Sequence, residues 1–93
     1  ESTVAPQALW MLNNPFVLGV AGDLAARLVR ERPGDSPEVA AARVERAWRL
    51  LYGRPPEPDE SAAALALVEA GGPGGWPDLA HVLLCTTEFV HVD

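Results

Sequence analysis

Two histidines and the single cysteine lie close together near the end of the chain, and they raise the question of a metal site. His81 and Cys85 are four residues apart, a spacing that places both on one face of a helix, and His91 follows six residues later. A structural zinc site needs four ligands, so Glu88 or Asp93 would have to supply the rest. Because short patterns of this kind often arise by chance, the sequence predicts neither a metal nor a cofactor.

Cys85 is also the one thiol that could act as a nucleophile, with His81 as its base. The reactive form is the thiolate, and apolar surroundings raise the pKa of a thiol. Cys85 ends the apolar run HVLLC, so we expect an unreactive residue that packs as a small apolar side chain. No other pattern combines a nucleophile, a base and oxyanion donors, and the sequence therefore predicts that the chain is not an enzyme.

Three carboxylates, Glu57, Asp59 and Glu60, follow a proline-rich turn and resemble in type the acid–base pair of a glycosidase. Such a pair needs one carboxyl group whose pKa is raised by a pocket, and nothing apolar surrounds these residues in the sequence. They stand at the start of an expected helix, where the helix dipole stabilises ionised carboxylates. We therefore expect them to be exposed and ionised.

The segment GGPGG is the one glycine-rich stretch that could cradle a phosphate group. It lacks the Lys-Ser or Lys-Thr of a nucleotide-binding loop, and it does not follow an expected strand. The sequence predicts a flexible loop here.

Arg54 and Glu88 are the polar residues for which we expect a structural role. Arg54 follows a helix end and precedes two prolines, so a stiff turn holds its guanidinium, whose fixed fork of donors suits a carboxylate. Glu88 stands just after the expected last helix, beside Phe89. We expect these two residues to join the turn to the end of the chain. The alternative is that Arg54 binds a ligand.

These residues belong to a chain of 93 amino acids, enough for one domain with one small core. The chain is 48% apolar and 22% charged, a composition that argues against intrinsic disorder. The formal net charge is −6 and all seven basic residues are arginines, so no nucleic-acid partner is expected. The single cysteine leaves the redox compartment undetermined.

The apolar opening stretch, TVAPQALWMLNNPFVLGVAG, fits neither a signal peptide nor a membrane span. No Lys or Arg precedes Arg27, whereas a signal peptide begins with basic residues. The sequence Asn13-Asn14-Pro15 interrupts the run before the roughly 20 apolar residues that a spanning helix needs. It instead predicts a helix break, because Asn14 can cap free N–H groups and Pro15 suits the first position of a new helix.

Apolar residues at helical spacing predict an all-α protein, a compact bundle of about five short helices that forms a single domain over residues 1–93. The expected helices cover roughly Pro6 to Asn13, Pro15 to the residues before Pro33, Pro37 to the residues before Gly53, Pro58 to the glycines, and Trp76 to near Phe89. The side chains expected to face the core are Val17, Val20, Ala21, Leu24, Ala25 and Leu28 in the second helix, Ala40, Val44, Ala47, Trp48 and Leu51 in the third, and Leu79, Val82, Leu83 and Thr86 in the fifth.

The first expected helix carries the candidate binding residues, Trp10 and Met11. It is only about two turns long, so it forms by packing. Its apolar side chains surround it almost completely, and a helix at the edge of a small domain leaves one side without a partner in the chain. We therefore expect Trp10 or Met11 to be partly exposed and to mark a docking surface.

Three blocks of the sequence carry a family resemblance. These blocks are TVAPQALWMLNNPFV, RVERAWRLLYGRPPEPDE, and the final LAHVLLCTTEFVHVD after a tryptophan. Their motifs are Pro-Gln-Ala-Leu with Asn-Asn-Pro-Phe-Val, Gly-Arg-Pro-Pro, and Leu-Leu-x-Thr-x-Glu-Phe. In this order the blocks resemble the C-terminal part of the planctomycete family called domain of unknown function 1553, also named the PSD-type planctomycete domain. The chain departs from the family at Tyr52, where Leu is usual, and at Glu57, where Ser or Thr would cap the fourth helix.

The resemblance implies a context more than a chemistry, because no established activity accompanies the family. Such regions form the last part of large exported proteins, so the resemblance places the chain in the periplasm or cell envelope. The favoured function is a non-catalytic helical module for interaction or structure. Its partners are upstream domains of the same polypeptide or another protein, with a weak homodimer as a further option. The alternative is a fragment that contributes residues to an active or ligand-binding site formed mainly by upstream domains.

Overall fold

The computed structural model of the chain describes residues 13–90, with side chains described for residues 13–86. The described residues form four α-helices and no strand: α2 (Pro15–Glu31), α3 (Pro37–Tyr52), α4 (Pro58–Gly71) and α5 (Gly75–Val90), with a short 3₁₀ helix, η1 (Gly72–Gly74), before α5. The predicted all-α, compact globule is confirmed. The predicted number of about five helices is not, and the expected helix from Pro6 to Asn13 falls almost entirely outside the described residues.

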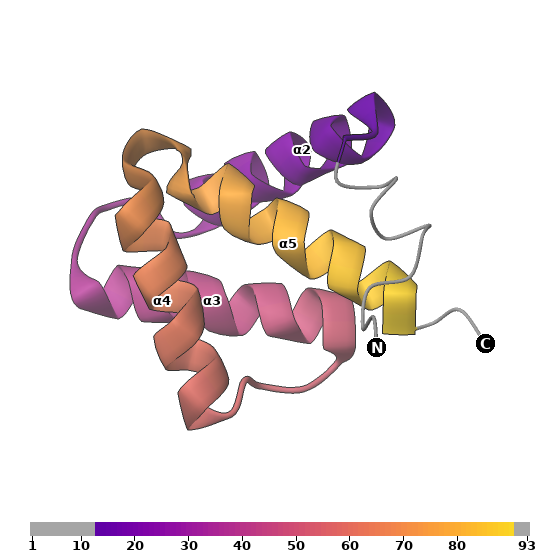
Figure 1. The fold of residues 1–93 in the computed structure, drawn as a ribbon. Helices are drawn as coiled ribbons and strands as arrows, with labels where there is room; N and C mark the ends of the chain where they lie inside the picture. The colour runs from indigo at the N-terminus through magenta and orange to yellow at the C-terminus, as the bar shows by residue number, and fades with distance from the viewer. Residues whose placement is uncertain (1–12, 91–93) are drawn as a thin grey trace.

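Helix α5 is the element against which the others pack (Figure 1). It contacts α2, α3 and α4, and most extensively α2 and α4. The larger core cluster joins all four helices and consists of Leu28, Val44, Ala47, Trp48, Ala64, Leu79 and Leu83. A smaller cluster, formed by Ala21, Ala25 and Ala80, lies between α2 and α5, where small side chains bring the two helices close together.

The helix starts follow the local signals of the sequence. The Asn14 side chain accepts hydrogen bonds from the backbone N–H groups of Phe16 and Val17, at 2.8 and 3.2 Å, and Pro15 is the first residue of α2. Ser36 caps α3 in the same way by accepting from the N–H of Val39 at 3.1 Å. These contacts satisfy donors that a helix end leaves free, and they confirm the predicted start of α2.

Two residues of α5 that were expected to face the core do not. The Val82 side chain is 44% exposed, and Thr86 is exposed as well. The reason is that α2 covers α5 beside Ala80, which is 1% exposed, so the buried face of α5 extends from Leu79 and Leu83 toward α2 and away from Val82. The prediction for Trp48, by contrast, is confirmed, since its side chain is 6% exposed within the main core.

Arg43 is a buried charged residue that the helical pattern did not predict. Its side chain is 6% exposed, its Nε–H donates to the Arg32 carbonyl oxygen at 2.8 Å, and its Nη2–H donates to the Gly34 carbonyl oxygen at 2.9 Å. The guanidinium carbon also lies 5.2 Å from the centroid of the Trp76 ring. Arg43 thereby fixes the chain between α2 and α3 against the first turn of α5.

The glycine-rich segment is a close helical connection and not the expected flexible loop. Helix α4 ends at Gly71, η1 spans the next three residues, and α5 begins at Gly75. A Cβ atom at Gly75 would overlap the carbonyl oxygen of Val68, so only glycine allows the two helices to approach this closely.

We predict that Gly75→Ala destabilises the protein by about 3 kcal/mol, in the upper range for overpacking, because the clash is with backbone and not with a movable side chain. The matched control is Gly74→Ala, where the nearest atom to an added Cβ is an Asp78 carboxylate oxygen at 4.0 Å. Denaturant unfolding of both variants measures the difference. Equal stability of the two variants would contradict the close approach at Gly75.

We predict that Arg43→Lys costs about 1.5–3 kcal/mol of stability, because an ammonium group loses the paired hydrogen bonds of the guanidinium and its planar contact with Trp76. Arg46→Lys, on the same helix, is the control, since Arg46 makes a surface ion pair with Glu31 at 3.2 Å and such pairs contribute at most about 1 kcal/mol. Urea unfolding at neutral pH compares the two variants. A loss in Arg46→Lys as large as that in Arg43→Lys would show that burial of Arg43 is not decisive.

Candidate functional site

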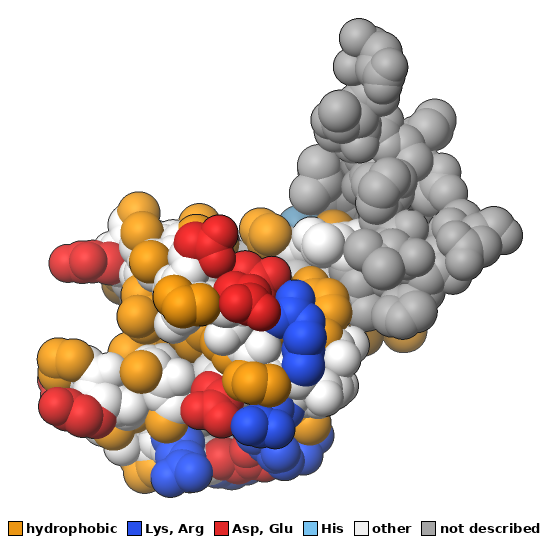
Figure 2. Space-filling model, turned by 90° about the horizontal axis from the view of Figure 1, so that it is seen from below, with side chains coloured by type: hydrophobic (Ala, Val, Ile, Leu, Met, Phe, Trp, Pro, Cys, Tyr) orange, Lys and Arg blue, Asp and Glu red, His pale blue; other side chains and the backbone are white. Residues whose placement is uncertain are grey.

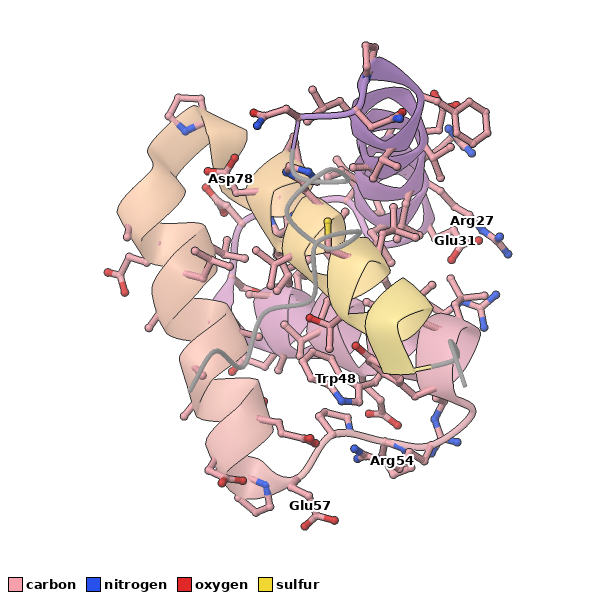
Figure 3. The ribbon with its side chains drawn as sticks, turned by 45° about the vertical axis from the view of Figure 1, so that its right-hand side comes forward. Arg27, Glu31, Trp48, Arg54, Glu57 and Asp78 are labelled. Atoms are coloured by element: carbon pink, nitrogen blue, oxygen red, sulfur yellow. The ribbon has the colours of Figure 1, made fainter. Side chains whose placement is uncertain are left out.

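A cavity of about 530 Å³ opens where the turn between α3 and α4 meets α5. Its lining side chains come from the end of α3, the following turn, the first turn of α4 and the second half of α5. They are Trp48, Leu51, Tyr52, Arg54, Glu60, Leu83 and Thr86. We call this cavity the turn pocket, and Figure 3 shows Trp48 and Arg54 near one another at this end of the molecule.

Local sequence signals position the polar rim of the turn pocket. Gly53 ends α3 in the left-handed conformation, with φ 74°, and its N–H donates to the Arg49 carbonyl oxygen at 3.1 Å. Pro55 and Pro56 follow and restrict the turn. The chain then enters α4 at Pro58, which brings Glu60 in the first helical turn opposite Arg54.

Arg54 and Glu60 form a two-pronged ion pair. The Arg54 Nη1 and Nη2 groups donate to Glu60 Oε1 and Oε2, each at 3.0 Å. Nη1 also donates to the carbonyl oxygen of Pro55 at 2.9 Å, and the guanidinium carbon lies 6.0 Å from the centroid of the Tyr52 ring. This planar, paired geometry is the arrangement that a guanidinium makes best with a carboxylate.

The ion pair strongly favours the ionised form of Glu60. The hydrogen bonds from Arg54 are the largest cause that lowers the pKa of Glu60, to about 2, and the backbone N–H of Glu57 is the next. That N–H donates to Glu60 Oε1 at 2.8 Å, as in one half of a capping box. Glu60 therefore both caps the start of α4 and binds Arg54.

The structure gives Arg54 a partner, Glu60, that the sequence analysis did not predict. Both terminal nitrogens of Arg54 are bound to Glu60, and α5 continues through position 88 instead of ending before it. The Glu88 side chain lies outside the described side chains, so its own contacts stay a prediction. The segment RPPEPDE contained a signal for this pairing. Its last residue, Glu60, lies six residues after Arg54 and occupies the third helical position, where a carboxylate is typical of a capping box.

Trp48 contributes a buried polar side chain to the turn pocket. Its indole Nε1 is buried without a hydrogen bond of standard geometry to a described group, and a weak hydrogen bond from the indole to Glu60 is the smallest of the causes that lower the pKa of that carboxyl group. The Trp48 ring packs against Tyr52 with ring centroids 5.7 Å apart, and the Tyr52 hydroxyl donates to the Leu83 carbonyl oxygen over a long 3.5 Å. The turn pocket thus has apolar walls and an ionic rim.

A second hollow lies between α2 and the segment formed by η1 and the start of α5. This hollow has a volume of about 430 Å³ and is lined almost entirely by small or apolar residues. They are Gly22, Ala25, Ala26, Val29 and Arg30 from α2, Pro73 from η1, and Trp76 and Pro77 from the start of α5. We call it the α2 groove. Large apolar side chains elsewhere on α2 are also exposed, including Phe16 at 77% and Leu18 at 47%.

The other predicted site residues do not gather into a reactive centre within the described residues. Cys85 is buried, and burial raises the pKa of its thiol, as expected from the sequence. His91 lies outside the described residues, as do Trp10 and Met11, so the predicted docking role of the latter two stays a prediction. Among the residues that the structure describes, no three His, Cys, Asp or Glu side chains lie close enough together to hold a metal ion.

Charged residues are interleaved on the face shown in Figure 2. Arginine side chains adjoin carboxylates there, with hydrophobic side chains between them. Three of the ion pairs join Arg27 to Glu31, Arg49 to Glu45 and Arg54 to Glu60. In the described part of the chain, none of the helices is long and apolar enough to cross a membrane.

Comparison with known proteins returns one family. The family model PSD1, described as a protein of unknown function (DUF1553), matches residues 1–68. The matched residues include the first two of the three blocks noted in the sequence and extend into α4. No curated protein and no solved structure matches the chain.

We predict that the Arg54–Glu60 pair makes stability depend on acid pH. Because the pKa of Glu60 is lowered from 4.5 to about 2 in the folded protein, its contribution is complete above pH 4.5 and is lost as the pH falls through about 2. Thermal unfolding of the wild type should therefore lose more stability across this window than unfolding of Glu60→Gln. The control is Glu45→Gln, which removes an exposed pair with Arg49. A carboxyl NMR titration that places the Glu60 pKa near 4.5 would contradict the prediction.

Proposed function

The chain belongs to the DUF1553 family of proteins of unknown function, and from its surface we propose that it is a non-catalytic helical module that docks against another part of a larger exported protein. The observation that carries this proposal is the α2 groove. Its lining is apolar apart from Arg30 at the edge, which suits burial against a partner better than contact with water.

The side chains of the α2 groove fit a helix as the docked element. Gly22 and Ala26 are exposed and present almost no side-chain volume along α2, so the backbone of a second helix can approach closely and fill the hollow. Trp76 and its neighbouring prolines form the opposite wall. A partner helix with an apolar stripe would bury its side chains between these two walls, as in other helix-in-groove contacts.

The proposed occupant is an apolar helix from the upstream part of the same polypeptide. The family resemblance supports this choice, because it implies a position at the end of a larger protein. The sequence is also compatible with it, since the apolar residues Trp10 and Met11, for which we expect a docking role, stand four to five residues before α2. A second copy of the chain is the competing occupant.

The polar groups of the described residues support a role without catalysis. Arg27, Arg46 and Glu31 form a surface network of ion pairs, and Glu60 is held ionised by Arg54. The Cys85 thiol has a raised pKa because of burial, which disfavours the nucleophilic thiolate.

We predict that Gly22→Glu abolishes docking and that Gly19→Glu does not. Both glycines lie in α2 with open space around an added Cβ, but only Gly22 lines the α2 groove. Each substitution should raise helix stability by roughly 0.5 kcal/mol, because glutamate is the better helix former. Calorimetric titration of the module with the remaining part of its parent polypeptide should therefore show binding for the wild type and Gly19→Glu only.

Equal binding by the two variants would contradict docking at the α2 groove. Sedimentation of the chain alone tests the competing occupant. If the wild type associates with itself at high concentration and Gly22→Glu remains monomeric, a second copy takes the place of the upstream helix. The variant Trp10→Ser, Met11→Ser in the same experiments shows whether those two residues belong to the same surface.

A further inference from the structure

Helix α4 has no polar face along its middle. Residues 62–68 read AAALALV, so apolar side chains point in every direction over nearly two helical turns. A helix that is apolar on all sides is normally buried on all sides. In α4, however, only Ala64 is fully buried, whereas Ala62, Ala63 and Ala66 are exposed. Helix α4 therefore presents an apolar face that no other described residue covers.

An apolar hollow opens beside this face, along the seam between α4 and α5. We call it the seam hollow; it has a volume of about 220 Å³ and adjoins the turn pocket, with which it shares three lining residues. Its lining consists of Trp48, Glu60, Ala63, Ala64, Leu67, Leu79, Val82 and Leu83. Because an apolar cavity of about 150 Å³ can hold a benzene molecule, the seam hollow has room for one large apolar side chain.

The half of the chain that forms this surface carries negative charge. No lysine or arginine follows Arg54, whereas seven acidic residues do. Glu60 is neutralised by Arg54, but two other carboxylates lie at the opposite ends of α4 (Figure 3). Glu57 directly precedes the helix, and an added Cβ at Gly71 would lie 2.9 Å from Asp78 Oδ2. The apolar surface is thus flanked by a carboxylate at each end.

We propose that α4 and the seam hollow bind an amphipathic helix of a protein partner, with one large apolar side chain in the hollow and basic side chains near both ends. Helix α4 has 14 residues and spans about 21 Å at a rise of about 1.5 Å per residue. A partner helix of similar length places its terminal Lys or Arg residues opposite Glu57 and Asp78. The exposed alanines let its backbone approach closely, as in other helix-in-groove contacts.

The charges decide which helix suits this surface. An acidic helix or an anionic lipid surface would be repelled at both ends of α4, whereas a basic helix is attracted and oriented there. A second copy of the chain is less suitable, because many of its cations are already occupied. Arg27 is paired with Glu31, and Arg49 is paired with Glu45.

This surface is separate from the α2 groove. None of the residues that line the seam hollow lines the α2 groove. The proposal therefore does not depend on the proposed docking function, and the two can fail separately.

The test is a calorimetric titration of the chain with a synthetic helical peptide. The peptide carries leucines along one face and lysines in its first and last turns, and its counterpart has glutamates in place of the lysines. We expect saturable binding of the lysine peptide, weakened by added salt because the flanking charges are exposed. The glutamate peptide should not bind.

One pair of variants tests the apolar part of the surface. Ala63 and Ala41 are both exposed alanines within helices, but only Ala63 lines the seam hollow. Ala63→Arg should weaken binding of the lysine peptide by about tenfold or more, because a bulky cation then stands where the partner must approach. Ala41→Arg adds the same charge on α3 and should leave binding unchanged. Circular dichroism checks that both variants stay folded, as expected for a good helix former.

A second pair of variants tests the charged ends. Glu57→Gln combined with Asp78→Asn should lower the affinity for the lysine peptide and reduce its dependence on salt. The control is Asp35→Asn combined with Glu38→Gln, which removes two exposed carboxylates near the start of α3. This control should bind as the wild type does.

Several results would overturn the proposal. One is the absence of saturable binding of the lysine peptide, and another is equally tight binding of the glutamate peptide. Equal binding by Ala63→Arg and Ala41→Arg would place the peptide elsewhere on the molecule, and equal binding by the two carboxylate variants would remove the role of the flanking charges. Sedimentation tests the remaining occupant: if the wild type associates with itself and Ala63→Arg is monomeric, a second copy covers this surface and not a separate partner.

Discussion

The buried guanidinium of Arg43 is the contact on which the arrangement of the helices depends. A charged group loses its hydration on burial, so it must be compensated by hydrogen bonds and by favourable neighbours. Arg43 obtains these from the carbonyl oxygens of Arg32 and Gly34 and from the face of Trp76. One side chain of α3 therefore holds the end of α2 and the start of α5 in fixed positions.

Both candidate surfaces follow from that arrangement. Trp76, which contacts Arg43, also forms a wall of the α2 groove, so the buried charge contributes to the shape of an apolar surface. At the other end of α3, Trp48 belongs to the core and also lines the turn pocket. Helix α3 therefore lines the pocket directly and supports the groove through the contact of Arg43 with Trp76.

Helix α5 completes both surfaces, and it lies beyond the residues matched by the family model. The match ends at residue 68, within α4. Leu83 and Thr86 of the turn pocket, and Trp76 and Pro77 of the α2 groove, all come from α5. The close approach at Gly75 sets how α5 leaves α4, and therefore how these side chains meet the residues of the matched region.

The sequence by itself determined the described helices and most of their inward faces. Asn14, Ser36 and Gly53 act within four residues of themselves, through caps and a left-handed turn, so their effects can be read from neighbouring positions. The burial of Trp48 and the raised pKa of Cys85 could also be predicted, because each follows from an apolar stripe on one helix.

The tertiary structure alone decided which helices pack together, which side chains are buried and which polar groups are paired. The exposure of Val82, the burial of Arg43 and the pairing of Arg54 with Glu60 depend on neighbours that the helical period does not specify. The same is true of Gly75, whose need for glycine comes from a carbonyl group on another helix. The turn pocket could not be predicted for this reason, since its lining combines residues from α3, α4 and α5 that meet only when the helices pack.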